Sequence, residues 1–408
     1  MRLNPFRALR PPRDFAARVA SVPYDVVNRE EAAQLAKGDA VSFLHVCRPD
    51  IDLPPDVDPH DDRIYARGRE NLDRFQAEGT LVRDDQPSIY IYRLVMGGKA
   101  QTGLVGCVHI DDYENDLIKK HEKTRRDKED DRTRHVLEMN ANAEPVFLTY
   151  KDEAEVARLM AEAVKGEALY DFAAVDGVRH TMWKAPDAAA LVQAFGKVPH
   201  VYVADGHHRC ASAWRAGKAL RQKNPNHTGR EEYNWFLAVL FPASQVRIMA
   251  YNRVVKDLNG QTPAQVLEKL RSVGRVSAAD KPTPPAPGSF GVYLDRRWHL
   301  VEIDEKSIDR SDPINSLDVA LLESRVLEPI LGIGDIRTDK RIDFVGGIRG
   351  TAELEKRLNG GEMAIAFSMY PTTVAQLMAV SDAGRIMPPK STWFEPKLRS
   401  GLLVHTLD

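Results

Sequence analysis

Segment 201–213 predicts a β-strand, a tight turn and the beginning of an α-helix in immediate succession. An apolar run ends at Asp205, and an alanine-rich helical pattern follows from Cys210. The beginning of a helix offers unpaired backbone N–H groups and a partial positive charge, so it binds anions readily. Gly206 lets the backbone approach a ligand closely, and the Arg209 guanidinium can hold a phosphate through two parallel hydrogen bonds. The segment therefore predicts a phosphate-binding turn.

Three more polar side chains share this turn, namely Asp205, His207 and His208. We expect His207 to bind the phosphate, and Asp205 and His208 to assist by hydrogen bonding or proton transfer. The alternative is a capped helix beginning with one buried histidine. That alternative does not account for two histidines and an arginine in one turn. Adjacent histidine side chains diverge and no metal-ligand spacing follows, so no metal site is expected here.

Segment 118–135 is dense in charges of both signs. Such density is typical of a solvated helix face with ion pairs four residues apart. Within it, Glu122 is a carboxylate able to act as a base, and Lys123 and Arg125 have the donors to pair with a phosphate. The residues leave both interpretations open.

Two further segments carry candidate substrate-binding residues. Segment 22–27 is expected to be extended, since a proline restricts the residue before it. Asp25 lies where this segment turns toward a helix, so we expect Tyr24 and Asp25 to contact a substrate. Lys390 and Ser391 follow two prolines, and their rigid loop could hold an anion or only close the C-terminal region.

Composition narrows the class of protein. The chain has 57 basic and 59 acidic side chains among 408 residues, a net charge of -2. General binders of nucleic acid or membrane surfaces are usually more basic, so neither partner is expected. Three cysteines without a CxxC pair, no secretory signal and no bilayer-length apolar stretch together predict a cytoplasmic protein. The GxxxxGK[ST], GxGxxG, GxSxG and HExxH patterns are absent, so the corresponding enzyme classes are not expected.

Strand and helix patterns alternate along the chain, which predicts an α/β or α+β fold. Segments 88–96 and 101–110 are typical of a hairpin joined by two glycines, and 234–241 of a fully buried strand. Residues 317–331 have the pattern of a helix.

Four prolines between residues 278 and 288 forbid regular structure there. We therefore predict an N-terminal α/β region of residues 1–277 and a C-terminal α/β region of residues 289–408. Residues 278–288 are expected to form the linker between them.

Several short motifs follow one another along the chain. They are Pro5–Arg10, Val22–Asp25, His121–Arg125, Ala204–Arg209, Arg341–Ile348 and Met387–Phe394. In this order the chain resembles, nearly end to end, a large prokaryotic family known only as domain of unknown function 1015.

The Asp-Gly-His-His-Arg turn also resembles the phosphate-binding turn of ParB-like partition proteins, sulfiredoxin and free-serine kinases. This resemblance implies a ParB/sulfiredoxin-like mixed-sheet core with an additional C-terminal α/β domain. It also implies nucleotide phosphates held by Gly206 and Arg209, with His207 and His208 beside them. Sulfiredoxin carries its catalytic cysteine where His207 stands here, and no basic helix-turn-helix of the ParB kind occurs. Members of the family that the chain resembles are commonly encoded beside serine-biosynthesis enzymes, and this association favours the kinase branch.

The expected function is a small-molecule kinase that phosphorylates free L-serine, with ATP or ADP as donor and Mg2+. Phosphoryl transfer consists mostly of positioning and charge neutralisation. Glu122 would accept the hydroxyl proton, while Lys123 and Arg125 would pair with the transferring group. Asp205 or Asp25 would help to place Mg2+. The alternative is a non-catalytic nucleotide-binding regulatory protein, which needs no base, and either form could be a homo-oligomer.

Overall fold

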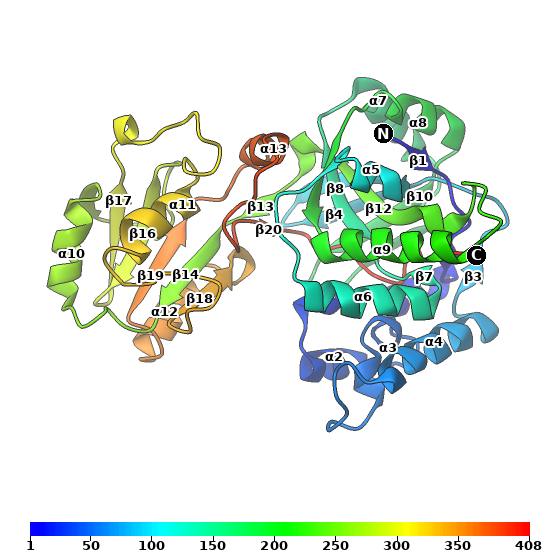
Figure 1. Ribbon diagram of the computed structural model, residues 1–408, viewed down its shortest axis with the longest axis horizontal. Coiled ribbons are helices and arrows are strands. Elements are labelled where there is room, and N and C mark those ends of the chain that lie inside the picture. The colour runs from blue at the N-terminus through cyan, green and yellow to red at the C-terminus, as the bar shows by residue number, and fades with distance from the viewer. The chain divides into compact units, whose positions relative to one another are not determined.

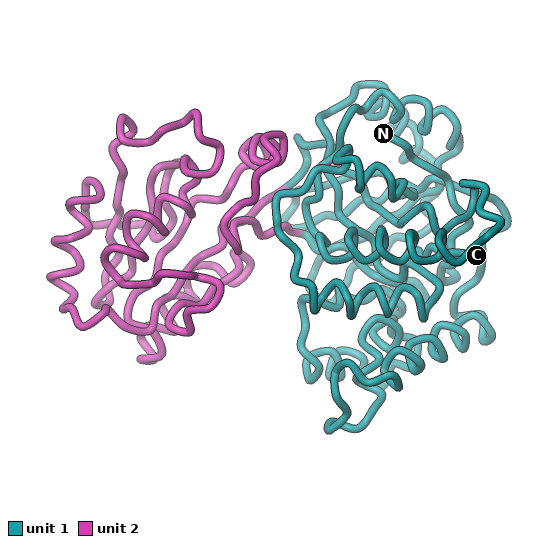
Figure 2. The backbone as a smooth tube through the Cα atoms, viewed as in Figure 1, with its two compact units in different colours: residues 1–246, 396–408 teal, residues 247–395 magenta.

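The computed structural model describes residues 1–408, and the chain divides into two compact units (Figure 2). The first unit consists of residues 1–246 and 396–408, and the second of residues 247–395. The chain thus leaves the first unit once and returns to it for its last segment. Both units contain strands and helices, so the predicted mixed α/β class is confirmed. None of the helices has the length and apolar character needed to cross a membrane.

The first unit is built on a nine-stranded mixed sheet in the order β6-β11-β8-β12-β5-β4-β10-β9, with β1 paired to β5. Its strands are β1 (Leu3–Asn4), β4 (Tyr90–Met96), β5 (Lys99–His109), β6 (Ile118–Lys119), β8 (Val146–Tyr150), β9 (Tyr170–Ala173), β10 (Arg179–Lys184), β11 (Val201–Asp205) and β12 (Trp235–Pro242). β6 runs parallel to β11 and β8 parallel to β12, whereas the other neighbours are antiparallel. Because β6 and β11 are parallel, the chain that leaves β6 lies beside the chain that leaves β11.

The strands follow from local pattern. β12 is a continuous apolar run, buried along almost all of its length between β8 and β5. β4 and β5 form the predicted hairpin, and Gly97 and Gly98 both take positive φ in its turn. The strand predictions for 88–96, 101–110 and 234–241 are therefore confirmed.

Helices cover the sheet of the first unit. They are α1 (Ala16–Val19), α2 (Arg29–Ala36), α3 (Leu44–Cys47), α4 (Asp62–Ala77), α5 (Ile110–Glu114), α6 (Arg126–Met139), α7 (Ala154–Ala163), α8 (Ala188–Phe195) and α9 (His207–Lys223). α9 and α6 lie side by side in front of the sheet, and α2, α3 and α4 lie beyond α6 (Figure 1). The inner side of α9 packs Cys210, Ala211 and Ala213 into the sheet core.

Short elements complete the first unit. β2 (Leu9–Arg10) pairs with β3 (Val82–Arg83), and β7 (Ala141–Asn142) pairs with β21 (His405–Thr406). The 3-10 helices are η1 (Arg13–Phe15), η2 (Tyr24–Val26), η3 (Pro49–Asp52), η4 (Glu232–Asn234) and η5 (Ala243–Gln245). The expectation of an extended segment at 22–27 is wrong at η2, where the Val26 N–H donates to the carbonyl of Pro23 at 3.3 Å in a 3-10 turn, although Pro23 and Val27 keep extended ψ angles of 149° and 142°.

The second unit is built on a six-stranded sheet in the order β15-β17-β16-β19-β14-β18. Its strands are β14 (Tyr251–Val255), β15 (Arg275–Ala278), β16 (Ser289–Leu294), β17 (Arg297–Glu302), β18 (Ile342–Gly346) and β19 (Ile365–Met369), with β13 (Ile248–Met249) paired to β20 (Trp393–Phe394). Its helices are α10 (Pro263–Arg271), α11 (Asp318–Leu322), α12 (Ala352–Asn359) and α13 (Val374–Asp382), the 3-10 helices η6 (Glu305–Ser307) and η8 (Gly347–Arg349), and the π-helix η7 (Glu323–Leu327). The predicted helix at 317–331 is thus α11 continued by a π-helical turn.

This division differs from the expected boundary at 278–288. The proline-rich segment lies inside the second unit, where it connects β15 to β16. Both of these strands pair with β17, so residues on either side of the prolines belong to one sheet. Prolines end a strand, but whether they also end a unit depends on where the next strand pairs.

Candidate functional site

The turn between β11 and α9 has the geometry of an open helix beginning. Gly206 is the N-cap of α9, with φ 94° and ψ 36°, and no side chain caps the helix. A Cβ at Gly206 would lie 3.0 Å from Arg209 Nε and 3.1 Å from its Cζ. Only glycine therefore allows the guanidinium to fold back over the turn. α9 begins at His207, earlier than the alanine-rich pattern alone indicates, so both histidines and Arg209 lie in its first turn.

Arg209 is buried, at 8% exposure, but only part of its hydrogen-bonding capacity is used. Nη1 donates to the carbonyl of Pro145, whereas Nε is buried without a hydrogen-bond partner. Nη2 lies 3.7 Å from Asp25 Oδ2 and 3.7 Å from Asp205 Oδ1. Burial opposes the charge, but these carboxylates raise the pKa of Arg209 above the ordinary arginine value. A permanent cation with donors to spare thus lies at the positive end of a helix.

Asp205 is held by a residue from the far end of the chain. Lys397 Nζ donates to Asp205 Oδ2 at 2.9 Å. Although burial opposes ionisation, Lys397 and Arg209 hold the pKa of Asp205 below its usual value. Residues 205 and 397 are 192 positions apart. Lys397 was not among the predicted site residues, and no local pattern marks it.

Tyr24 and Asp25 reach the site through η2. The backbone N–H of Tyr24 donates to Glu144 Oε1 at 3.0 Å, and the guanidinium of Arg132 lies 4.3 Å from the centre of the Tyr24 ring. Burial raises the pKa of Glu144, while Arg209 and Arg132 oppose that rise. Asp25 is 39% exposed and faces Arg209. Glu144 and Arg132 were not among the predicted site residues, although Arg132 belongs to the charged segment 118–135.

A small cavity of about 30 Å³ lies beneath these charges. Its polar lining includes Arg132, Glu144 and Arg209, and Phe236 and Leu237 contribute apolar atoms. A water molecule needs roughly 10–15 Å³ of such volume, so the cavity has room for about two. Arg132 Nη1 is buried without a protein partner, which gives a water molecule there a donor to bind.

The loop after β6 brings part of the charged segment to the turn. The rings of His121 and His207 meet edge to face, with centroids 4.4 Å apart. His207 Nδ1 lies 3.8 Å from Glu122 Oε2, and the backbone N–H of Arg125 donates to His208 Nε2 at 3.1 Å. Burial lowers the pKa of His121 to about 4, and burial beside His121 places the pKa of His207 well below its ordinary value. Both rings are therefore neutral at pH 7.

The side chains of Lys123 and Arg125, the predicted cations of this segment, lie at the margin of the turn. The guanidinium of Arg125 binds its neighbour Asp127, with Nη2 2.7 Å from Oδ2, so Arg125 reaches the turn through its backbone. Lys123 is exposed. The solvated-face interpretation fits only the mostly exposed start of α6 at 126–130, because Arg132 and His135 of the same helix are largely buried. The functional interpretation stays a prediction for the loop at 120–125.

Lys390 and Ser391 belong to the second unit, where they form part of a buttressed loop. Ser391 Oγ donates to the carbonyl of Pro388 at 2.6 Å. The carbonyl of Lys390 accepts a hydrogen bond of 3.0 Å from Nη2 of the fully buried Arg253. Their substrate-binding role stays a prediction. No group of three or more His, Cys, Asp or Glu side chains in residues 1–408 is arranged to hold a metal ion.

Comparison with known proteins extends over most of the chain. Residues 3–320 match the model of a family described as "Protein of unknown function (DUF1015)". No curated protein matches.

The chain also resembles several solved structures. A conserved hypothetical protein from Pyrococcus furiosus is 13% identical at a TM-score of 0.35, with 73% of this chain and 93% of that chain covered. A free serine kinase in complex with AMP is 13% identical at a TM-score of 0.35, covering 73% and 90%. A C-terminally truncated SbnI from Staphylococcus aureus is 12% identical at a TM-score of 0.38, covering 74% and 86%. These scores lie below 0.5, so the activity of this chain has to be inferred from its own residues.

Proposed function

This chain belongs to the DUF1015 family, and we propose that it is a nucleotide-dependent kinase of a small hydroxyl metabolite, with free L-serine as the first candidate acceptor. The observation that carries the proposal is Arg209, a buried cation with a spare donor in the uncapped first turn of α9. Such a cation is costly to bury unless its donors find partners. Phosphate oxygens of ATP or ADP are suitable partners for both the guanidinium and the first-turn amides.

Glu122 is the proposed proton acceptor. It is 53% exposed, and its carboxylate lies 3.8 Å from His207 Nδ1, at the edge of the turn. A carboxylate in this position can accept the proton of an acceptor hydroxyl group while the ring of His207 orients it. Lys123 would approach the transferring phosphoryl group from the same loop. The guanidinium of Arg125 would have to release Asp127 before it could bind that group.

Asp25 suits a cation better than Asp205 does. Mg2+ in kinases is usually held by one or two carboxylates together with substrate phosphates, and it neutralises charge on those phosphates. Asp25 is partly exposed, whereas Asp205 is engaged by Lys397. In this proposal Asp205 and His208 shape the turn, since His208 accepts the hydrogen bond that anchors the loop at Arg125.

The choice of acceptor rests on the motif alone. The Asp-Gly-His-His-Arg turn at 205–209 is similar to the turn of free-serine kinases. Tyr24 and Asp25 are the candidate acceptor contacts within the first unit.

The test is phosphorus NMR of the full-length protein with Mg2+, ATP or ADP, and a set of hydroxyl metabolites led by L-serine. We expect a new phosphomonoester signal with L-serine. Glu122→Gln should lose turnover but keep nucleotide affinity, and the matched control Glu114→Gln, a carboxylate paired with Lys218, should keep both.

Binding without turnover would favour the nucleotide-binding regulatory protein. A folded protein that neither binds nucleotide nor forms a phosphomonoester would overturn the proposal.

A further inference from the structure

Two carboxylates of the site are held by side chains from the last segment of the chain, residues 396–408. Lys397 Nζ donates to Asp205 Oδ2 at 2.9 Å, and Ser400 Oγ donates to Glu144 Oε1 at 3.2 Å. Glu144 in turn anchors the backbone of Tyr24. The returning segment thus contacts Asp205 within the turn and Glu144, one of the charges near Arg209.

This segment is firmly attached to the first unit. Ser400 exchanges backbone hydrogen bonds of 2.9 and 3.1 Å with Ser21, and Val404 exchanges bonds of 2.8 and 2.9 Å with Leu9. Arg399 is almost completely buried and forms an ion pair with Asp176. Lys397 therefore approaches Asp205 from a backbone that the surrounding structure positions.

The charge of Asp205 matters for any anion at α9. Asp205 directly precedes Gly206, the N-cap of α9, so it belongs to the same turn as the first-turn amides that would hold a phosphate. The other cation within 4.0 Å is Arg209, whose Nη2 is 3.7 Å away. Without Lys397 an uncompensated carboxylate would attract the guanidinium of Arg209 and repel an anionic ligand.

We infer that Lys397 is a positioning residue of the anion site, which neutralises Asp205 and thereby leaves Arg209 available for phosphate oxygens. The inference rests on the proposed function for the ligand class, a di- or triphosphate anion. It adds a residue that is far from the turn in sequence and that no motif of the turn contains.

The test measures the binding of ADP with Mg2+ and of inorganic pyrophosphate to the full-length protein by calorimetry. Lys397→Met should weaken both by about tenfold, the usual order for one uncompensated close charge. Adding Asp205→Asn to that variant should restore affinity to within about threefold of wild type, because the repelling charge is gone. Lys184→Met, which removes a lysine from the buried Asp84, is the matched control and should bind normally.

A pH series separates this role from a merely structural one. In Lys397→Met, Asp205 takes up a proton more readily than in the wild type. The wild type should therefore bind ADP and pyrophosphate more tightly than Lys397→Met at about pH 8, and this difference in affinity should shrink as the pH is lowered to about 5. Lys397→Arg keeps the charge and should bind within about threefold of wild type. This variant also serves if Lys397→Met does not fold.

The outcomes separate the two claims. Equal affinity of wild type and Lys397→Met, or no recovery on adding Asp205→Asn, overturns the role of Lys397 and leaves the kinase proposal standing. A wild-type protein that binds neither ADP nor pyrophosphate overturns both.

Discussion

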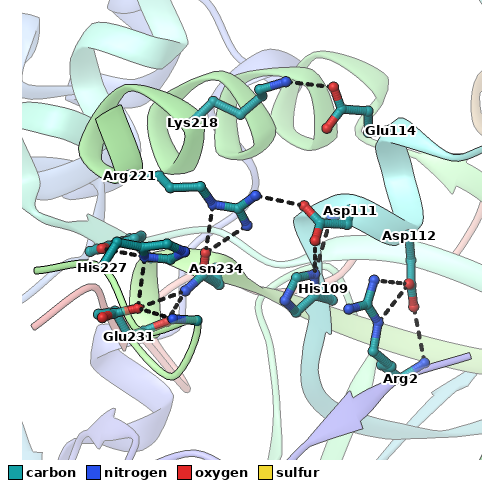
Figure 3. Close-up of polar contacts among 12 residues, drawn as sticks. Arg2, His109, Asp111, Asp112, Glu114, Lys218, Arg221, His227, Glu231 and Asn234 are labelled. Atoms are coloured by element: carbon teal, nitrogen blue, oxygen red, sulfur yellow. Dashed lines mark hydrogen bonds and ion pairs between the residues drawn. The ribbon is translucent and has the colours of Figure 1, made fainter. Parts of the chain in front are cut away.

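The two ends of α9 carry basic side chains in opposite circumstances. Near its C-terminus Lys218 and Arg221 are paired (Figure 3): Lys218 binds Glu114, and Arg221 Nη1 lies 3.0 Å from Asp111 Oδ1. Arg221 also donates twice to Asn234 Oδ1, at 3.1 and 2.7 Å. Near its N-terminus, Arg209 is buried with an unpartnered Nε.

The helix dipole explains why this difference matters. Cations are stabilised near the C-terminus of a helix and destabilised near its N-terminus. Lys218 and Arg221 therefore lie where stability favours them, whereas Arg209 lies where only a ligand or nearby carboxylates make a cation favourable. The paired charges at the C-terminal end therefore support the fold, and the buried cation at the N-terminal end fits the anion proposed there.

The largest effect is expected from replacing Arg209 at the N-terminal end of α9. Arg209→Ala leaves Asp25, Asp205 and Glu144 without their shared cation, so unfolding should become easier by about 3–5 kcal/mol in urea titrations, and ADP binding should be lost. Arg209→Lys should recover most of the stability but little of the affinity, because an ammonium lacks the planar fork.

The control for this pair is Arg221→Ala, which should bind ADP normally. A folded Arg209→Lys variant with unchanged ADP affinity would contradict the placement of phosphate at this end of α9.

Protonation of His121 tests the surroundings of the same N-terminal end of α9 without a change to Arg209. Burial lowers the pKa of His121 from its ordinary 6.5 to about 4, so the unfolded chain binds a proton in this range that the folded chain does not. The free energy of unfolding should therefore decrease as the pH is lowered. His121 alone should account for a decrease of about 2 kcal/mol between about pH 6.5 and about pH 5. In denaturant titrations, the free energy of unfolding of His121→Gln should decrease by about 2 kcal/mol less over the same pH range. Parallel pH profiles of the two proteins would contradict the buried, neutral state of His121.

A smaller effect is expected from the N-cap. Gly206→Ala forces a positive φ on alanine and places its Cβ against Arg209 Nε, which should cost about 1–2 kcal/mol and also weaken ADP binding. Gly79 has a φ of 72° with no heavy atom within 4 Å of its Cβ position. Gly79→Ala should therefore lose about 1 kcal/mol by thermal unfolding and leave ADP affinity unchanged. If both variants bind ADP equally, the close contact between Gly206 and Arg209 is not part of the site.

The smallest effects are expected at the C-terminal end. Arg221→Ala leaves the buried Asn234 without two donors and should cost about 1 kcal/mol, whereas Lys218→Ala removes a solvent-screened pair and should cost less. Thermal unfolding measures both. A larger loss of stability from Lys218→Ala than from Arg221→Ala would show that the stabilisation by these pairs does not increase with their burial.

Local sequence predicted the elements whose determinants lie within a few residues. Gly97 and Gly98 close the predicted hairpin of β4 and β5, where both take positive φ. The turn at Gly206 was predictable for the same reason, since a strand, a glycine and a helix beginning are read from adjacent positions. Backbone preferences and side-chain periodicity act over this range, so the sequence alone specifies them.

Partners from distant segments were decided only by the tertiary structure. Lys397 meets Asp205 because the last segment returns to the first unit, and Asp25 meets Arg209 because η2 lies beside the beginning of α9. The proline-rich segment 278–288 became an internal loop because the strands on both sides of it pair with β17. Charge pairing has no sequence periodicity, and its partners depend on which strands are neighbours. The sequence by itself therefore determined the strand, the turn at Gly206 and the beginning of α9, and the fold determined the charges that surround this turn.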